Sequence, residues 1–361
     1  MDVVAAEVVV PCADLGPTLE FFTNRLGFRV EQISPADDPV AASISGHGVR
    51  LRLDRHATGA PGILRLRCSD ATVDDGHDVL TAPNGTIVEL VPSEEPMVVP
   101  PLAPSLVVSK VADAAGFGSG RAGMQYRDLI PDRQGGRFIA SHIRIPDGGP
   151  VPDYVHYHRI GFQLIYCARG WVEVVYEDQG EPFVMHAGDC VLQPPLIRHR
   201  VLNASAGMEV VEVGSPAVHD TYGDLDMTLP TGTIDPTRDF GGQQFVRHVA
   251  ADATWVPSQH PGLEVRETGL AVASNGAVGA RVLRATHAAT TPARTHDGEL
   301  LLMFVLAGET SLRVDADTVV ALGPSDSVVV PPHEPYSLME WSQDLEVLEV
   351  TVPGAASAVA A

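Results

Sequence analysis

Hydrophobic and polar positions alternate in many short stretches of this chain, and glycines and prolines separate the stretches. The alternation is clear in GRFIASHIRI, GWVEVVYED, MEVVEV, LRVD and DLEVLEVTV. A period of two in segments rich in Val, Ile and Leu predicts short strands with one buried face. With 34 glycines and 29 prolines between them, such strands predict antiparallel sandwiches or barrels, so the expected fold class is mainly β.

One stretch near the N-terminus has helical spacing instead. The apolar residues of 15–26 fall on one helical face, with Asp14 as the expected N-cap and Gly27 as the stop. A proline-rich stretch over 92–104 follows, which suits neither a helix nor a central strand. We therefore expect a small α+β part, then a linker, before the β-rich remainder.

The β-rich remainder repeats itself with a period of roughly 138 residues. MQYRD matches LEVRE, IASHIRI matches VGARVLR, HRIGFQLIYCARG matches HDGELLLMFVLAG, VLQPP matches VVVPP, and MEVVEV matches LEVLEV. Order and spacing agree throughout, so two copies of one β-unit are expected. The predicted segments are an N-terminal domain at 1–95, a linker at 96–104, a first barrel at 105–231, a second barrel at 232–353 and a flexible tail at 354–361.

The first copy of the repeat contains three histidines with metal-ligand spacing. His156 and His158 project to one face of a strand, because side chains alternate with period two. His199 follows a Pro-Pro turn and can return from a third strand, while Gln163 begins the strand after HxH. Three imidazoles that converge inside a small barrel predict a metal site, since neutral imidazole is the commonest protein ligand for transition metals.

These residues resemble the two signature motifs of the cupin superfamily, G-x5-HxH-x3,4-E-x6-G and G-x5-P-x-G-x2-H-x3-N. The sequence meets nearly every position, but Gln163 replaces the usual Glu, Leu196 replaces a Gly, and the first spacer is one residue longer. With its repeat, the chain resembles a bicupin over about residues 105–353. The resemblance implies two jelly-roll barrels and a metal held by His156, His158 and His199, with Gln163 as a fourth ligand or as a hydrogen-bond partner of water or substrate.

The second copy of the repeat has lost this ligand set. The alignment puts Arg294 at the His156 position, His296 at the His158 position, Leu301 at the Gln163 position and Tyr336 at the His199 position. We therefore expect one metal per chain and a second barrel that serves as a packing partner.

The N-terminal part resembles the glyoxalase or vicinal-oxygen-chelate fold, through EVVVPCADLGPTLEFFTNRLGFRVE and TAPNGTIVELV. The resemblance implies one βαβββ module followed by a truncated second one. In that family the positions of Glu7 and Glu89 are metal ligands, but the strands between them offer arginines and leucines. The expected role of this domain is therefore scaffolding or dimerisation.

Two further residues on the first barrel are candidates for catalysis. His142 and Arg144 alternate on one strand and share a face, which either points into the pocket or is exposed. An arginine inside the pocket would hold a substrate carboxylate through two hydrogen bonds.

Charge and composition limit the classes of molecule that the chain is expected to bind. Asp and Glu total 46 against 24 Lys and Arg, a formal charge of −22, which argues against nucleic acids and anionic membranes as partners. The four cysteines show no paired spacing, which is typical of reduced thiols in a cytoplasmic protein. The expected partner is a small molecule, and a homodimer is left open.

Three neutral histidines and a neutral Gln would leave the metal its double charge, which favours an anionic substrate that chelates through two oxygens. The leading hypothesis is an Fe(II)-dependent bicupin dioxygenase that also consumes O2. A non-redox isomerase or lyase that uses Mn, Ni, Co or Zn is the second hypothesis, and a small-molecule binding protein without catalysis is the third.

Overall fold

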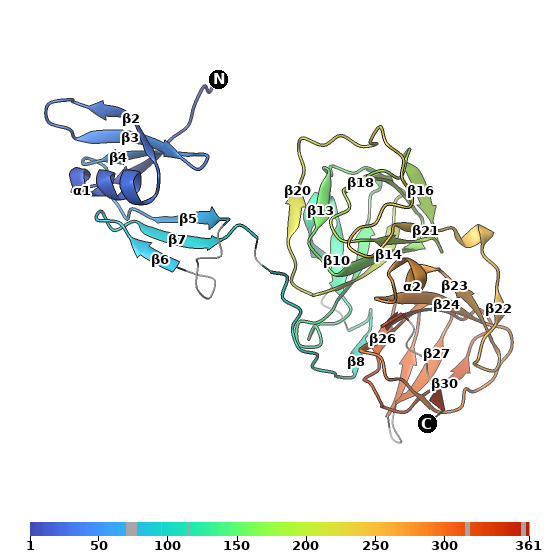
Figure 1. Cartoon of the computed structure of the whole chain (residues 1–361). Helices are drawn as coiled ribbons and strands as arrows, with labels where there is room; N and C mark the ends of the chain where they lie inside the picture. The colour runs from blue at the N-terminus through green and yellow to red at the C-terminus, as the bar shows by residue number, and fades with distance from the viewer. Residues whose placement is uncertain (70–77, 95, 114–115, 315–317, 355–358, 361) are drawn as a thin grey trace. The chain divides into compact units, whose positions relative to one another are not determined.

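A computed structural model describes residues 1–69, 78–94, 96–113, 116–314, 318–354 and 359–360, and the expected tail at 354–361 lies mostly outside them. The chain is 46% strand and 6% helix, which confirms the mainly β class. It divides into two compact units, Met1–Pro96 and Met97–Ala361, which Figure 1 shows. Among the described residues, no helix has the length and apolar character needed to cross a membrane.

The first unit begins with the element order β, α, β, β, β and forms two sheets. The four-stranded sheet has the order β1-β4-β3-β2, with β1 parallel to β4, and the three-stranded sheet has the order β5-β7-β6. The strands are β1 (Val8–Pro11), β2 (Arg29–Ser34), β3 (Ala41–Gly46), β4 (Val49–Asp54), β5 (Ile63–Cys68), β6 (Asp78–Thr81) and β7 (Ile87–Pro92).

The predicted helix is present but changes character halfway along. An α-helical part, α1 (Leu15–Glu20), continues as a π-helical turn (Phe21–Arg25), and Gly27 ends it with a φ of +74°. Asp14 makes no side-chain cap, contrary to the expectation; its backbone carbonyl accepts a hydrogen bond from the Thr18 hydroxyl at 2.6 Å instead. Phe22 is fully buried against the sheets.

The second unit contains two barrels, each made of two facing antiparallel sheets. In the first barrel the sheet orders are β21-β17-β14-β19-β11-β10-β9 and β16-β15-β18-β13-β20, with β12 paired to β18. The strands are β9 (Gly118–Ser119), β10 (Gln125–Asp128), β11 (Ile139–Ile145), β12 (Gly149–Pro150), β13 (His156–His158), β14 (Phe162–Arg169), β15 (Trp171–Tyr176), β16 (Phe183–His186), β17 (Cys190–Gln193), β18 (His199–Ala204), β19 (Met208–Ser215), β20 (Thr221–Gly223) and β21 (Val246–His248).

The second barrel has the same construction. Its sheet orders are β22-β23-β24-β31-β26-β29-β8 and β28-β27-β30-β25-β32. The strands are β8 (Val107–Ser109), β22 (Val256–Pro257), β23 (Leu263–Glu267), β24 (Gly279–Ala285), β25 (Arg294–Thr295), β26 (Leu300–Ala307), β27 (Thr310–Val314), β28 (Thr318–Leu322), β29 (Ser327–Val329), β30 (Tyr336–Trp341), β31 (Glu346–Val352) and β32 (Val359–Ala360). Short helical turns lie at Arg121–Gly123, Ala250–Asp252 and α2 (Leu270–Ala273).

Each barrel completes its large sheet with a strand from the other repeat. β8 precedes the first barrel in sequence but pairs with β29 of the second, and β21 lies in the expected second-barrel segment but pairs with β17 of the first. The expected segments at 105–231 and 232–353 therefore differ from the sheets by these two strands, because a strand pattern does not reveal which edge a strand will join.

The two barrels share the backbone conformation of one turn, which precedes His199 in the first barrel. Leu196, at the position where the cupin motif has Gly, has a φ of +66°, and His333 has the same φ in the second barrel. The N–H of Leu196 donates to the carbonyl of His158 at 3.1 Å, and that of His333 donates to the carbonyl of His296 at 2.8 Å. The motif's glycine preference thus reflects a left-handed backbone that both barrels keep without glycine.

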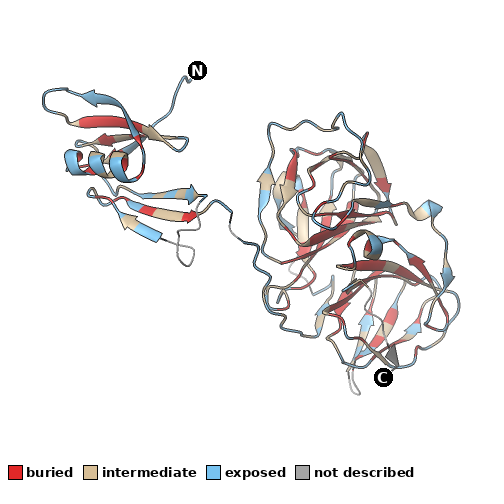
Figure 2. Cartoon of the chain, viewed as in Figure 1, coloured by how far each residue is buried: buried red, intermediate tan, exposed pale blue. Residues whose placement is uncertain are grey.

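The two barrels pack sheet against sheet. The even-numbered side chains of β14, β24, β26 and β31 form one buried cluster with odd-numbered ones of β19 and β29. Figure 2 shows buried residues along β14, β24 and β26. Alternation makes the opposite face of each strand line the interior of its own barrel. The cluster includes Phe162, Leu164, Tyr166, Leu192, Val211, Val213, Ala280, Val282, Leu300, Leu302, Phe304, Val329, Leu348 and Val350.

Candidate metal centre

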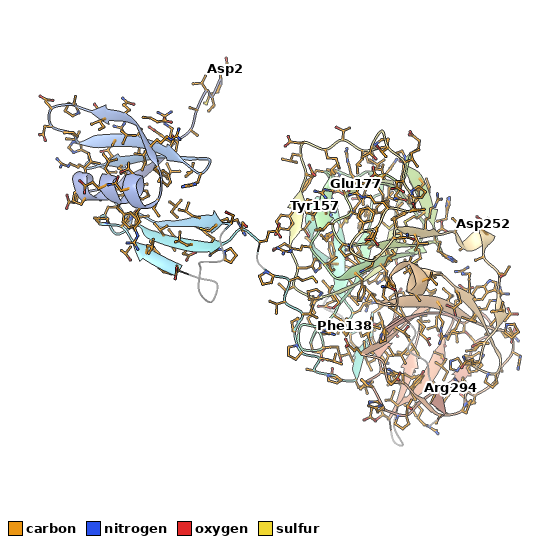
Figure 3. All side chains as sticks on the ribbon, in the orientation of Figure 1. Asp2, Phe138, Tyr157, Glu177, Asp252 and Arg294 are labelled. Carbon is orange, nitrogen blue, oxygen red and sulfur yellow. The ribbon has the colours of Figure 1, made fainter. Side chains whose placement is uncertain are left out.

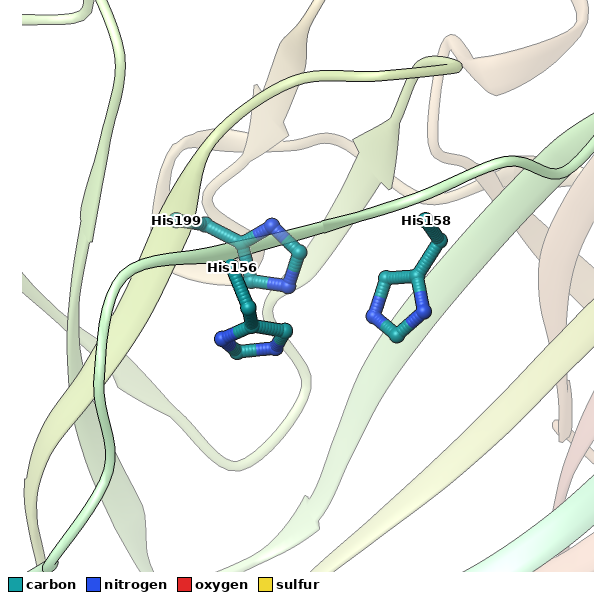
Figure 4. A group of neighbouring side chains, drawn as sticks. All are labelled: His156, His158 and His199. Carbon is teal, nitrogen blue, oxygen red and sulfur yellow. The ribbon is translucent and has the colours of Figure 1, made fainter. Parts of the chain in front are cut away.

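The structure brings the three predicted histidines together inside the first barrel. His156 and His158 lie on β13, His199 begins β18, and His156 and His199 are direct partners across the two strands. One ligand atom from each histidine lies within 4.8 Å of the others, and Figure 4 shows the rings grouped around a common space. Among the residues that the structure describes, this is the group of His, Cys, Asp and Glu with metal-site spacing.

Hydrogen bonds orient two of these rings for a metal. The Nδ1 of His156 donates to the carbonyl of Tyr154 at 2.8 Å, and the Nδ1 of His199 donates to the carbonyl of Ile197 at 3.0 Å. A carbonyl oxygen can only accept, so in each neutral ring Nδ1 carries the proton and Nε2 carries the lone pair. Such outer partners are typical of metal-binding histidines, because they fix the tautomer and the ring orientation.

The three rings also favour the neutral state that a metal requires. Burial lowers the pKa of His158 to about 3, with contributions from His156, His219 and Arg121. Burial likewise lowers the pKa of His199 well below its usual value, and burial together with the Arg121 charge lowers that of His156. Neutral imidazoles, two of them with an unprotonated Nε2, fit a divalent transition metal.

Two donors presently face those lone pairs. The guanidinium of Arg121 lies 2.9 Å from His156 Nε2, and the amide nitrogen of Gln193 lies 3.1 Å from His199 Nε2. Arg121 is also ion-paired with the buried carboxylate of Asp153. A metal on the triad would take over the lone pairs and leave the Arg121 guanidinium, still anchored by Asp153, beside it.

Gln163 lies in the same cavity, and both ends of its amide are engaged. Its oxygen accepts from the Gln193 amide at 3.0 Å, and its nitrogen donates to the Glu212 carboxylate. Gln193 is held in turn by the Tyr176 hydroxyl at 2.9 Å. In this arrangement Gln163 bridges a neighbouring amide and a carboxylate, and its assignment as a fourth metal ligand stays a prediction.

His142 and Arg144 lie away from this cavity. The cavity is lined by their neighbours Ser141 and Ile143 on β11, so the predicted pair occupies the opposite face of that strand. His142 packs between the rings of Phe117 and Phe304 and contacts Glu209 at 2.8 Å. Their catalytic role therefore has no support from position.

Arg144 is engaged elsewhere. It donates to Gln125 at 2.8 Å and stacks on Phe117, with its guanidinium carbon 3.9 Å from the ring centre.

Two charged residues of the cavity were not predicted, Arg121 and Glu212. Burial raises the pKa of Glu212, and the hydrogen bond from Gln163 partly offsets the rise. The repeat carried a signal for Glu212, because MEVVEV and LEVLEV keep a glutamate at 212 and 349. Arg121 lies in an irregular segment without any repeat signal.

The second barrel places its substituted residues as the alignment expected. Arg294 pairs with Tyr336 across β25 and β30, as His156 pairs with His199 in the first barrel. Arg294, labelled in Figure 3, donates to the carbonyl of Gln259 at 3.0 Å, and His296 contacts the carbonyl of Val330 at 2.9 Å.

The two glutamates of the N-terminal unit are paired with other side chains. Glu7 accepts a hydrogen bond from Ser43 at 3.0 Å and lies 3.3 Å from Arg50, and Glu89 lies 2.8 Å from Arg65. Each carboxylate is thus engaged by an arginine, and neither belongs to a group of metal-ligand residues among those that the structure describes.

Comparisons with known proteins agree with the barrel fold. A family model described as a cupin domain matches residues 141–214, and one described as an AraC-binding-like domain matches residues 237–360. No curated protein matches the chain. Both family matches lie outside the N-terminal unit, so the glyoxalase resemblance of residues 1–95 stays a prediction.

Solved structures with similar folds include several oxalate decarboxylases. The Bacillus subtilis enzyme at pH 4.6 has 14% identity and a TM-score of 0.53, with 75% of this chain and 81% of that chain covered. The Lactobacillus farciminis enzyme in a formate complex has 14% identity and a TM-score of 0.52, with coverages of 74% and 90%. A B. subtilis structure used to study its Mn(II) centres has 13% identity and a TM-score of 0.52, with coverages of 74% and 82%. Residues 141–214 thus match a cupin-domain model and residues 237–360 an AraC-binding-like model, in a two-barrel arrangement similar in fold to the oxalate decarboxylases.

Proposed function

We propose that this protein is a metal-dependent bicupin enzyme that acts on a small chelating anion. The observation that carries the proposal is the triad of neutral imidazoles, two of which donate from Nδ1 to a backbone carbonyl and so keep an unprotonated Nε2. Through these nitrogens His156, His158 and His199 would hold one divalent transition metal. When bound, the metal supplies Lewis-acid polarisation of substrate oxygens and, as Fe(II) or Mn(II), a redox-active centre.

The chain's own residues supply charge and orientation around that centre. Arg121 is the cation beside the triad, and its tether to Asp153 would let the guanidinium bind an anionic head group without losing its position. Glu212 is a half-buried carboxyl in the same cavity, where burial raises its pKa, so it is the candidate acid–base group beside the triad. The mostly apolar walls around them exclude water and strengthen these interactions.

Within this proposal, an Fe(II)-dependent dioxygenase is the leading activity, because the triad adds no negative charge and leaves positions for both a chelating anion and O2. The fold similarity to Mn(II)-containing decarboxylases supports a lyase as the second candidate. O2 uptake during turnover separates the two activities. Metal retention without any turnover would instead support a binding protein.

The metal site itself can be tested by metal content. We expect one metal ion per chain, complete loss of retained metal in His158→Ala, and unchanged retention in His296→Ala, the matched change in the second barrel. Purified proteins reloaded anaerobically with Fe(II) or Mn(II) would be measured by elemental analysis. Two ions per chain, or retention in His158→Ala, would overturn the assignment.

A further inference from the structure

The cavity of the first barrel is divided into a polar mouth and an apolar chamber. The triad, Gln163, Gln193 and Glu212 line the polar end, where the exposed Thr221 contacts His158, and this end is taken as the mouth. Beyond the Glu212 layer the wall includes five aliphatic or thioether side chains from four strands: Ile143, Val174, Met185, Met208 and Val210.

The strand register shows how abruptly the polarity ends. Ser141 of β11 pairs with Glu212 of β19, and both line the cavity. One inward-facing step deeper, Ile143 pairs with Val210. Below the Glu212 layer, the described residues that line the cavity from β11, β15 and β19 are all apolar.

The cavity is larger than a small dicarboxylate needs. Its volume is about 250 Å³, whereas an apolar cavity of about 150 Å³ already accommodates benzene. A dianion of two carbons would occupy the mouth and leave the chamber unfilled, at the cost of lost dispersion contacts. A ligand with an apolar group would fill it.

We infer that the substrate carries an apolar tail about the size of a six-carbon chain or ring behind its chelating anionic head. The head would lie between the triad and Arg121, and the tail would lie among Ile143, Met185 and Val210. This inference rests on the proposed function for the position of the head. It sets the substrate class apart from oxalate, which has no apolar part.

A homologous series of ligands tests the chamber directly. We would titrate the Mn(II)-loaded protein with straight-chain 2-oxo acids from pyruvate to 2-oxooctanoate, and with oxalate, by isothermal titration calorimetry. Each added methylene should tighten Kd about three- to fourfold until the chamber is full. Oxalate binding more tightly than every longer acid, or no gain with chain length, would overturn the inference.

Cavity-filling variants test whether the gain in affinity with chain length arises in the chamber. Val210→Phe and Val172→Phe enter the chamber from different strands, so one informative variant remains if the other fails to fold. Each should reduce the affinity ratio between 2-oxooctanoate and pyruvate at least tenfold. Val319→Phe, at an exposed valine of β28, is the matched control and should leave the ratio unchanged. An unchanged ratio in both folded chamber variants would also overturn the inference.

The two proposals fail in different ways. If the wild-type chain retains no metal, the proposed function fails, whatever the ligand series shows. If metal is retained as expected but affinity does not rise with chain length, the metal centre stands and the apolar tail alone is wrong.

Discussion

At the residue scale, the pairing of Gln163 with Glu212 explains the departure from the cupin motif. The amide of Gln163 donates to the Glu212 carboxylate and accepts from Gln193. A glutamate at position 163 would have no hydrogen to donate and would face a second carboxylate. The acidic group of this cavity therefore lies on β19, and an amide stands at the position where the motif has an acid.

This pairing leads to a prediction for Gln163→Glu. The variant should retain metal, because the three imidazoles are unchanged, and should bind the anion pyruvate roughly fivefold more weakly, about 1 kcal/mol for one added negative charge. Gln163→Ala should retain metal and bind pyruvate without that electrostatic penalty. Parallel Mn(II) and pyruvate titrations of the three proteins measure both effects. Tightest pyruvate binding in Gln163→Glu would show that charge matching to an anion is wrong.

The buried histidines make the metal-free protein sensitive to acid. In the unfolded chain each histidine takes up a proton near its ordinary pKa of about 6.5, whereas the folded-state pKa of His158 is lowered to about 3. Stability is then fully present above the unfolded-state pKa and decreases as pH falls from about 6.5 towards the folded-state pKa of about 3. Urea unfolding at several pH values should show this decrease.

A single-residue variant identifies the source of that decrease. In His158→Asn, the number of protons taken up on unfolding should fall by up to one, so the slope of unfolding free energy against pH should decrease. His186→Asn, at an exposed residue of β16, is the control. Equal slopes in the wild type and His158→Asn would contradict the assignment.

At the element scale, the exchange of β8 and β21 ties the two barrels together. β8 pairs with β29 over three residues, and β21 pairs with β17 over three residues. Each large sheet would otherwise end in an unpaired edge beside the shared apolar cluster, which is a hazard for aggregation. The two barrels therefore behave as one structural unit.

The exchange predicts that the second barrel does not fold alone. A fragment of residues 232–361 lacks β8 and exposes its half of the cluster between the barrels. It should be aggregated or unfolded, whereas residues 97–361 should be folded. Size-exclusion chromatography with far-UV circular dichroism would compare them. A folded monomeric 232–361 fragment would show that the exchanged strand is dispensable.

At the scale of the whole molecule, the candidate metal ligands of the described residues lie in one of the two barrels. The Glu7→Gln/Glu89→Gln double variant should therefore keep the metal content of the wild type, because both carboxylates are paired with arginines. Elemental analysis of the reloaded proteins tests this. A loss of about one ion per chain would show that the N-terminal unit also binds metal.

The sequence by itself determined the mainly β class, the two-fold repeat and the three histidines. Period-two alternation and fixed spacing along a strand express backbone geometry directly, so they can be followed without tertiary structure. The repeat also puts Arg294 at the His156 position and Tyr336 at the His199 position, and these two residues pair across β25 and β30.

Tertiary structure alone decided which face of β11 points inwards. The sequence match set Ile139 against Val278, but the pairings of Ile139 with Gly214 and of Gly279 with Thr351 shift the true equivalence by one residue. A shift of one residue exchanges the two faces of a strand. With the correct register, His142 corresponds to Val282.

That correspondence explains why His142 lies at the contact between the barrels, since Val282 belongs to the buried cluster there. The two charged residues of the cavity could not be predicted from strand alternation either. Arg121 reaches the triad from an irregular segment, and Glu212 meets Gln163 across two strands far apart in sequence. Alternation predicts neighbours along one strand, whereas these contacts depend on how strands and loops close around a common interior.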